Sequence, residues 1–280
     1  MAEVEPFDGA TRLAAVIGSP VRHSRSPAIL NAAFRAAGIH WAFLAFEVVE
    51  AEAAAAVGAM RSLGLGGLSV TMPLKEAVIP ALDGLSEDAA ALRAVNCVAW
   101  DGDRLVGHNT DGAGLVRSLS VDHGIEVAGR SCVVLGAGGA ARSVVRSLAR
   151  AGAASVSVVN RTPERAEVAA ALADGVGRVA HPDAIESADL IVNATSVGMG
   201  ANGDDQGPSP VADGLLHEGQ VVVDLVYLPL RTPLLAQAEA AGARPVDGLG
   251  MLVHQAAISM EHWTGVRADV GVMREAALAP

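Results

Sequence analysis

The chain has 280 residues, of which 51% are hydrophobic and 18% are charged. This composition can bury a sizeable core and excludes a largely disordered protein, and the length suits two domains of roughly 100–200 residues each. The formal net charge is −11 and no run of Lys and Arg stands out, which argues against a nucleic-acid partner or an anionic membrane surface.

The first half alternates strand-like and helix-like segments, as an α/β unit does. Proline in the first turn and apolar periodicity predict the helices, and short apolar runs predict the strands. The predicted elements, in chain order, are a strand over 13–18, a helix from Pro27 to about Gly38, a strand over 41–48, a helix over 50–63, a strand over 67–72, and a hairpin of strands 94–100 and 104–109.

The second half repeats the alternation more regularly from Arg130. Strands separated by helix-length segments predict a parallel, doubly wound sheet. The segment 201–210 is polar and rich in Gly and Pro, so a loop is expected there, and two helical patterns follow Gly248. The predicted strands are 131–137, 155–160, 189–195 and 221–227, and the predicted helices are 138–152, one that Pro163 begins, and 232–242.

The two cysteines, Cys97 and Cys132, show neither metal-binding spacing nor a disulfide framework, so the reducing cytoplasm is the expected compartment. The N-terminus MAEVEPFDGATR is acidic where a secretory signal needs a basic start. No uncharged run reaches the ~18 residues that a membrane span needs. A soluble protein without a bound metal is therefore expected.

A glycine-rich turn is the first motif that carries chemistry. Gly136-Ala137-Gly138-Gly139-Ala140-Ala141 follows an apolar strand and opens a helix, which is the context that the dinucleotide fingerprint requires. The glycines permit a tight turn and a close approach to a pyrophosphate, and the helix N-terminus offers N–H groups to its oxygens. A tight turn without a ligand can also use such glycines.

The end of the next strand indicates which dinucleotide is bound. NAD-binding proteins usually carry Asp or Glu there to hold the ribose 2′-hydroxyl. Here the sequence reads Asn160-Arg161-Thr162, with Arg165 one helical turn later. Guanidinium groups attract a 2′-phosphate, so NADP is favoured over NAD. Thr162 can also be the N-cap of the helix that follows, and the two interpretations are compatible.

Further polar clusters lie in the first half of the chain. Ser24 and Ser26 flank a helix start where a small carboxylate can bind, although capping by Ser26 explains them equally well. Lys75 follows a buried strand, at the edge where ligands bind in open α/β sheets, although most lysines are solvated surface residues. Asp111 ends a polar turn near the expected domain junction, and Asp in turns is usually structural.

The order of these motifs resembles the shikimate dehydrogenase family from about Val16 to Gly265. The matching strings are HSRSP, SVTMPLK, AVN, GxNTDG, GAGGAAR, NRT, NATSVGM, DLVYxPxxTPLL and GMLVxQ…WTG. The resemblance implies an α/β fold of two domains. A substrate-binding domain would span 1–111 and be completed by the returning C-terminal helices, about 250–280. A Rossmann-like NADP-binding domain with a doubly wound parallel sheet would span 112–249.

The resemblance also implies the activity. It points to an NADP-dependent oxidoreductase acting on a CH–OH group, which reversibly reduces 3-dehydroshikimate to shikimate in aromatic amino-acid (chorismate) biosynthesis. The expected enzyme is a cytoplasmic monomer or homodimer whose partner is its small-molecule substrate.

The resemblance assigns the site residues in three groups. Lys75 and Asp111 would be the catalytic pair. The substrate would be bound by Ser24, Ser26, Thr71, Lys75, Asn96, Asp111, Tyr227 and Gln255. The cofactor would be bound by Gly136, Ala137, Gly138, Gly139, Ala140, Ala141, Asn160, Arg161, Thr162, Arg165, Asn193, Ala194, Thr195, Met199, Leu225, Gly248 and Met251.

These residue types suit the chemistry. Negative charge develops on the ketone oxygen as hydride arrives, and an ammonium such as that of Lys75 can stabilise and then protonate it. Asp111 would orient Lys75 and accept a hydrogen bond from the substrate. A non-catalytic NADP-binding sensor is the alternative of another class, but a binding module has no need for a proton-transfer pair.

The sequence departs from the family's usual strings at several positions. Leu30 stands where His commonly precedes Asn31, and a packing effect is expected there. Cys97 replaces the Thr of AVNT, and Ala256 replaces the Gly after Gln255. The last two changes leave the ring substrate open among shikimate, quinate and an amino-substituted analogue.

Overall fold

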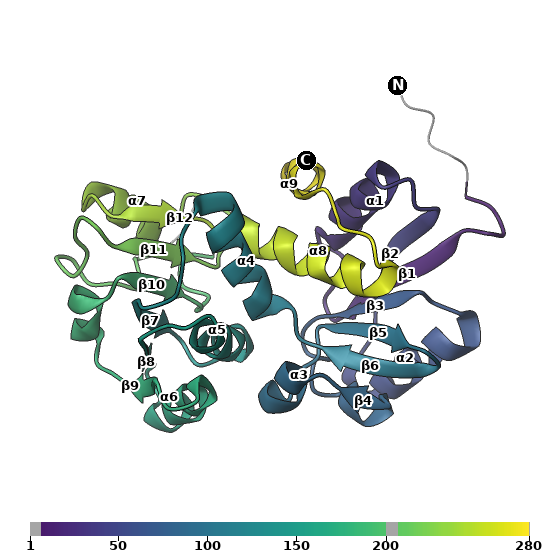
Figure 1. Cartoon of the computed structure of the whole chain (residues 1–280), viewed down its shortest axis with the longest axis horizontal. Coiled ribbons are helices and arrows are strands. Elements are labelled where there is room, and N and C mark those ends of the chain that lie inside the picture. Colours follow the sequence, from purple (N-terminus) through teal and green to yellow (C-terminus); the bar gives the residue numbers. More distant parts are fainter. Residues whose placement is uncertain (1–6, 200–206, 280) are drawn as a thin grey trace. The chain divides into compact units, whose positions relative to one another are not determined.

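The computed structural model describes residues 7–199 and 207–279 (Figure 1). The chain divides into two compact units, Met1–Thr110 with Ala256–Pro280, and Asp111–Gln255. The predicted α/β class with two domains is confirmed. The predicted limits at 111/112 and about 249/250 stay a prediction, and the boundary at 255/256 falls within helix α8 (Leu249–Thr264). Most of the predicted loop 201–210 lies outside the described residues.

The strands described in the first unit form a mixed six-stranded sheet in the order β2-β1-β3-β5-β6-β4. β2 and β3 flank β1 in parallel, and β5 and β6 form the predicted antiparallel hairpin. The strands are β1 (Arg12–Gly18), β2 (Trp41–Glu47), β3 (Gly67–Val70), β4 (Gly84–Leu85), β5 (Cys97–Asp101) and β6 (Arg104–His108). The helices are α1 (Ser26–Ala36), α2 (Ala53–Leu63), α3 (Glu87–Leu92) and α9 (Val270–Leu278), with 3₁₀ turns η1 (Glu50–Glu52) and η2 (Ile79–Ala81).

The C-terminal part of α8 is anchored to this sheet by Trp263. Its indole nitrogen donates to the carbonyl of Val98 at 3.0 Å, and its ring stacks on Phe43 with centroids 5.9 Å apart. His262 stacks on His108 of β6, with centroids 4.2 Å apart. Burial, together with the neighbouring His262, lowers the pKa of His108 to about 4. These contacts hold residues 256–264 against strands of the first unit.

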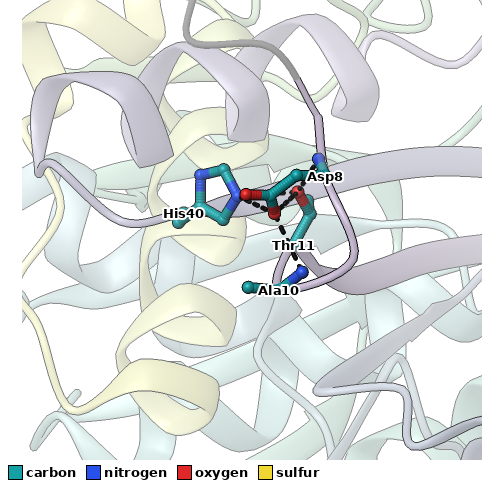
Figure 2. Close-up of polar contacts among 4 residues, drawn as sticks. All are labelled: Asp8, Ala10, Thr11 and His40. Carbon is teal, nitrogen blue, oxygen red and sulfur yellow. Dashed lines mark hydrogen bonds and ion pairs between the residues drawn. The ribbon is translucent and has the colours of Figure 1, made fainter.

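A polar cluster ties the starts of β1 and β2 together (Figure 2). His40, just before β2, lies 2.9 Å from Asp8 Oδ1 and 2.7 Å from the Thr11 hydroxyl, just before β1. Asp8 Oδ1 also accepts from the backbone N of Ala10 at 2.8 Å. The hydrogen bond with His40 holds the pKa of Asp8 below its usual value. The cluster is partly exposed, and it connects the segments that lead into β1 and β2.

The strands described in the second unit form a six-stranded, fully parallel sheet in the order β12-β11-β10-β7-β8-β9. The strand order reverses between β7 and β10, which confirms the doubly wound Rossmann arrangement. The strands are β7 (Ser131–Leu135), β8 (Ser155–Val159), β9 (Gly177–Val179), β10 (Leu190–Asn193), β11 (Val221–Asp224) and β12 (Arg244–Val246). The helices are α4 (Asp111–His123), α5 (Gly139–Arg150), α6 (Pro163–Ala170) and α7 (Pro233–Ala240), with 3₁₀ turns η3 (Ala171–Ala173) and η4 (Pro182–Ser187).

The central strands of this sheet are buried on both faces. On β7, Cys132 and Val134 join a core with α4, α5 and α6, whereas Val133 and Leu135 join a second core with η4 and α7. Two helical layers therefore cover the sheet, which explains why β7, β10 and β11 are continuous apolar runs rather than alternating ones.

Candidate active site

The glycine turn lies where β7 ends and α5 begins. Gly136 has φ +103°, and a Cβ there would lie 3.1 Å from Thr195 Cγ2 and 3.2 Å from the carbonyl oxygen of Ala194. Only glycine suits that backbone and that spacing. Gly138 is the N-cap of α5 and no side chain caps the helix. Open space surrounds the α-carbons of Gly138 and Gly139, so the helix start can receive a phosphate.

A cavity of about 420 Å³ opens beside this turn. Its walls come from the glycine turn and the starts of α5 and α6, and they are Ala137, Gly138, Gly139, Arg142, Glu164, Arg165 and Val168. Two arginines and one glutamate therefore line the space. Arg142 and Glu164 were not singled out from the sequence, although Arg142 directly follows the glycine motif.

The loop between β8 and α6 holds the other predicted phosphate ligands. Asn160 Nδ2 donates to the carbonyl of Thr162 at 3.0 Å, which shapes the turn, and Arg161 is exposed. Thr162 occupies the N-cap position of α6, but its side chain accepts no hydrogen bond from the helix. The predicted N-cap position is therefore confirmed, although the hydroxyl makes no capping hydrogen bond. The loop fits a 2′-phosphate, since it carries guanidinium and hydroxyl donors.

The remaining predicted cofactor residues gather at the same edge of the second sheet. Asn193 ends β10, and Ala194 and Thr195 border Gly136. A Cβ on Gly248 would lie 2.4 Å from the Leu225 carbonyl oxygen, so these two segments touch. Met251 and Leu225 pack partly buried against the core beneath the turn, whereas Met199 is exposed.

In the first unit, three predicted substrate residues meet where β3 ends. Thr71 donates its N–H to the carbonyl of Ile17 at 2.9 Å, and the carbonyl of Lys75 accepts from the N–H of Val95 at 2.8 Å. The carbonyl of Asn96 accepts from the N–H of Val70 at 2.8 Å. These backbone bonds bring Thr71, Lys75 and Asn96 to one edge of the sheet, at the carboxyl ends of β1 and β3.

Ser24 and Ser26 lie at the start of α1, which follows the same end of β1. Arg25, not Ser26, is the N-cap, and no side chain caps the helix. The interpretation of Ser26 as a capping residue is therefore wrong. Ser24 Oγ instead accepts from the Ser26 N–H at 3.2 Å, and Arg25 donates to the carbonyl of Ala279 at 2.6 Å, which ties the loop to the end of α9.

Asn96 has a structural role that the sequence did not reveal. Its Oδ1 accepts from the N–H of Thr110 at 2.8 Å, and its Nδ2 donates to the Thr110 hydroxyl at 3.0 Å. The Thr110 hydroxyl lies 3.4 Å from that of Ser259 on α8, and all three residues are buried. The amide of Asn96 therefore fixes the backbone directly before Asp111.

Cys97, which replaces the Thr of the family's AVNT string, faces the interior. Burial raises the pKa of its thiol to about 12, and the neighbouring Ser259 and Trp263 of α8 oppose that rise. Ala256, which replaces the Gly after Gln255, is also buried, with 2% of its surface exposed. Both substitutions therefore lie in packed surroundings.

Lys75 is the only lysine in the chain, and every other residue counted among the 20 of Lys and Arg is arginine. An arginine guanidinium does not give up its proton in proteins, whereas an ammonium can. Lys75 is therefore the one residue among these 20 cations whose side chain can release a proton. A count of lysines would have found this signal in the sequence.

Asp111 and Gln255 belong to the second unit and lie on helices that touch. Asp111 begins α4, and a Cβ on Gly114 would lie 2.7 Å from the backbone N of Gln255 on α8. His254 Nε2, fully buried, lies 3.1 Å from Asp122 Oδ1 further along α4. The close helix crossing fixes Gln255 relative to the start of α4. Tyr227 lies half-buried after β11.

Within the described part of the chain, no cluster of three or more His, Cys, Asp or Glu residues could hold a metal ion. No helix described there is long and apolar enough to cross a membrane.

Together, the doubly wound sheet and its glycine turn define a dinucleotide-binding protein. Three family models match the chain: the shikimate dehydrogenase substrate binding domain over residues 16–98, the shikimate / quinate 5-dehydrogenase over 120–199, and the shikimate 5′-dehydrogenase C-terminal domain over 248–278. A shikimate dehydrogenase (NADP(+)) of Thermococcus kodakarensis is 46% identical over 274 residues, which are 97% of each chain. The chain therefore belongs to the shikimate dehydrogenase family.

Solved structures agree with this assignment. A shikimate dehydrogenase in complex with NADP⁺ is 35% identical with a TM-score of 0.91, and the match covers 98% of this chain and 96% of that one. Shikimate 5-dehydrogenase from Thermus thermophilus, in complex with NADP(H) and shikimate, is 37% identical with a TM-score of 0.87, covering 95% and 98%. Quinate dehydrogenase from Corynebacterium glutamicum, in complex with NAD, is 31% identical with a TM-score of 0.85, covering 96% and 99%.

Proposed function

We propose that this protein reversibly reduces 3-dehydroshikimate to shikimate with NADPH, in the chorismate route to the aromatic amino acids. It is an NADP-dependent oxidoreductase acting on a CH–OH group, as its relatives' names and bound cofactors support. The observation that carries the catalytic proposal is the single lysine of the chain, Lys75, at the carboxyl edge of the first sheet. That residue also argues against a non-catalytic sensor.

The residues present fit NADP. The uncapped start of α5 would hold the pyrophosphate through residues 136–141. Asn160, Arg161, Thr162 and Arg165 would hold the 2′-phosphate, with Arg142 on the cavity wall as a further cation. The predicted residues after β10, β11 and β12 would bind the other half of the cofactor. Bound NADPH would supply the hydride that the reaction needs.

The chain's own contribution is positioning and proton transfer. Ser24 and Ser26 would hold the substrate carboxylate, and Thr71, Asn96, Tyr227 and Gln255 would fix the rest of the ring. As the ketone is reduced, the Lys75 ammonium would donate a proton to the oxygen, and in the oxidation direction Lys75 would accept it. Asp111 would orient Lys75 and accept a hydrogen bond from a ring hydroxyl.

We further propose that the protein acts in the cytoplasm as a monomer or homodimer. Cys97 and Cys132 are free buried thiols whose pKa is raised to about 12 by burial. Two unpaired thiols suit a reducing compartment.

A substrate panel tests the reaction. Shikimate, quinate and aminoshikimate, each with NADP⁺ and with NAD⁺, are assayed by absorbance of the reduced cofactor. We expect the highest kcat/KM for shikimate with NADP⁺, and a value about 10-fold or more lower with NAD⁺, because charge-assisted bonds to the 2′-phosphate are absent. A higher kcat/KM for quinate than for shikimate would contradict this proposal and identify the activity as that of a quinate dehydrogenase of the same fold. Binding of NADPH without turnover of any ring would favour the sensor.

The variant Arg161→Ala tests whether Arg161 binds the 2′-phosphate of NADPH. We expect KM for NADPH to rise about 10- to 100-fold, since hydrogen bonds to charged groups contribute about 1.5–3 kcal/mol, while KM for NADH stays almost unchanged. Arg178→Ala, on the exposed middle of β9, is the matched control and should leave both values unchanged. Equal losses with both cofactors in Arg161→Ala would show that Arg161 does not bind the 2′-phosphate.

A further inference from the structure

Asp224, the last residue of β11, carries a fully buried carboxylate at the cofactor edge of the second sheet. Its Oδ1 accepts from Asn193 Nδ2 at 2.9 Å and from the backbone N–H of Val226 at 3.1 Å. Its Oδ2 accepts from the Thr232 hydroxyl at 2.6 Å. One side chain therefore joins the end of β10, the segment after β11 and the start of α7.

The bonds to Asp224 within residues 7–199 and 207–279 come from an amide, a backbone N–H and a hydroxyl, all neutral. Burial raises the pKa of Asp224, because the charged carboxyl loses hydration, and the three hydrogen bonds oppose that rise. A buried carboxyl without a cation is costly, and an apolar residue would serve stability better. Packing alone therefore does not explain a carboxylate at position 224, and its hydrogen bonds indicate a role other than stability.

On one side, Asp224 determines how Asn193 holds the loop after β10. The amide NH₂ of Asn193 points to the carboxylate, so its Oδ1 points the other way and accepts from Thr195 N at 3.1 Å and Thr195 Oγ1 at 2.7 Å. The same NH₂ donates to the carbonyl of Val197 at 3.3 Å. The orientation of one amide therefore fixes the turn 194–197, which borders Gly136.

On the other side, Asp224 holds the segment after β11. It binds the N–H of Val226 directly, and Leu225 N donates to the carbonyl of Asn193 at 3.0 Å. Thr232 accepts from Leu235 N at 3.3 Å, so the hydroxyl that Asp224 binds also caps α7. The segment 225–227 and the turn 194–197 thus share one buried anchor.

The sheet topology indicates which half of the cofactor would lie near Asp224. In a doubly wound sheet the dinucleotide crosses the point where the strand order reverses, here between β7 and β10. The adenosine half belongs to the β7–β8 side, where Arg161 and Arg165 follow β8. The nicotinamide half therefore belongs to the β10–β11 side, which Asp224 organises.

We propose that Asp224 is a positioning residue for the nicotinamide half of NADP, acting through Asn193 and the segment 225–227. Asp224 would not contact the substrate or the nicotinamide itself. Its effect would come from the conformations of the turn 194–197 and the segment 225–227, which both depend on its carboxylate. This inference rests on the proposed NADP-dependent function.

The experiment compares Asp224→Asn with two controls. Asp189→Asn changes an aspartate at the opposite end of the same sheet, where Oδ2 accepts from Ser131 N at 2.8 Å. Val222→Ala creates a cavity in the middle of β11 and controls for lost stability. Two ligands are titrated as probes into each protein at a temperature well below its Tm. Binding of NADPH is measured by the fluorescence of the cofactor, and binding of adenosine 2′-monophosphate is measured by calorimetry.

We expect Asp224→Asn to raise the Kd for NADPH about tenfold or more, because the amide turns an acceptor into a donor within a coupled network. The Kd for adenosine 2′-monophosphate should stay at the wild-type value, since that probe lacks the nicotinamide half. Both controls should bind both probes as the wild type does. Wild-type NADPH affinity in Asp224→Asn, or a parallel loss of both probes there, would overturn the inference. Failure of the wild type itself to bind NADPH would instead overturn the proposed function.

Discussion

Lys75→Ala should lower kcat for shikimate oxidation by about 10²–10⁴-fold, the usual contribution of a positioned acid or base, while KM for shikimate changes far less. The reason is that the ammonium acts mainly as charge develops on oxygen, and an interaction made only in the transition state appears in kcat. Lys75→Arg should lose activity to a similar extent, because the guanidinium keeps the positive charge but does not release its proton.

The two Lys75 variants separate proton transfer from electrostatic stabilisation. Arg93→Ala is the matched control, since Arg93 is an exposed cation paired with Glu76, the residue after Lys75, at 3.1 Å. It should keep wild-type kcat and KM. Near-wild-type turnover in Lys75→Ala would remove Lys75 from the mechanism, and a fully active Lys75→Arg would reduce its role to that of a fixed charge.

The single lysine also permits a chemical test of the same assignment. An amine-reactive acylating reagent can modify only Lys75 and the α-amino group, because the chain contains no other lysine. Modification of Lys75 is measured by mass spectrometry, and the loss of activity should run in parallel with it. Added shikimate should slow both the modification and the loss of activity.

The sequence predicted the four central strands of the second sheet, because each of them is buried on both faces, but not the edge strands β9 and β12. Runs such as Val133–Leu135 and Val221–Val223 are apolar without alternation, which is typical of parallel strands covered by helices. The glycine turn could also be located, since the positive φ of Gly136 is a local backbone demand.

Other elements could not be predicted, because tertiary contacts outweigh local preference there. Helix α4 begins Asp-Gly-Ala-Gly, a poor helix sequence, yet Gly114 is needed where α4 touches Gln255. Strand β4 has two residues and β12 reads Arg-Pro-Val, so both depend on their neighbours in the sheet. β3 ends at Val70, before the predicted Met72, because the chain turns there towards Lys75.

The candidate site also contains features that the sequence predicted and features that it could not predict. Motif order assigned residue types to a pocket, but it could not show that the amide of Asn96 is bonded to Thr110, or that Asp224 anchors Asn193. Such bonds join residues distant in sequence and buried in the fold. Positions that a family string presents as ligands can therefore also be structural anchors, and their variants need a readout that separates the two roles.

Asp111→Asn should lower kcat by about 10²-fold or more, and it should do so mainly in the presence of Lys75. The substitution keeps the size of the side chain at the first residue of α4 and removes its negative charge. Asp111 would orient the ammonium and accept a hydrogen bond from the ring, and an amide can present its NH₂ where an acceptor is needed. Asp269→Asn, at the N-cap of α9, is the matched control for losing a carboxylate at a helix start and should leave kcat unchanged.

The double variant Lys75→Ala/Asp111→Asn tests whether the two residues act as a unit. If Asp111 works through Lys75, kcat of the double variant should be close to that of Lys75→Ala alone, since groups that act together are strongly non-additive. If the two losses multiply instead, Asp111 contributes independently, through the substrate hydroxyl only. The cycle is measured on kcat at saturating shikimate and NADP⁺, so that weaker binding in either variant does not enter the comparison. A multiplicative result would leave Lys75 as the proton donor and move Asp111 from the catalytic pair to the substrate-binding residues.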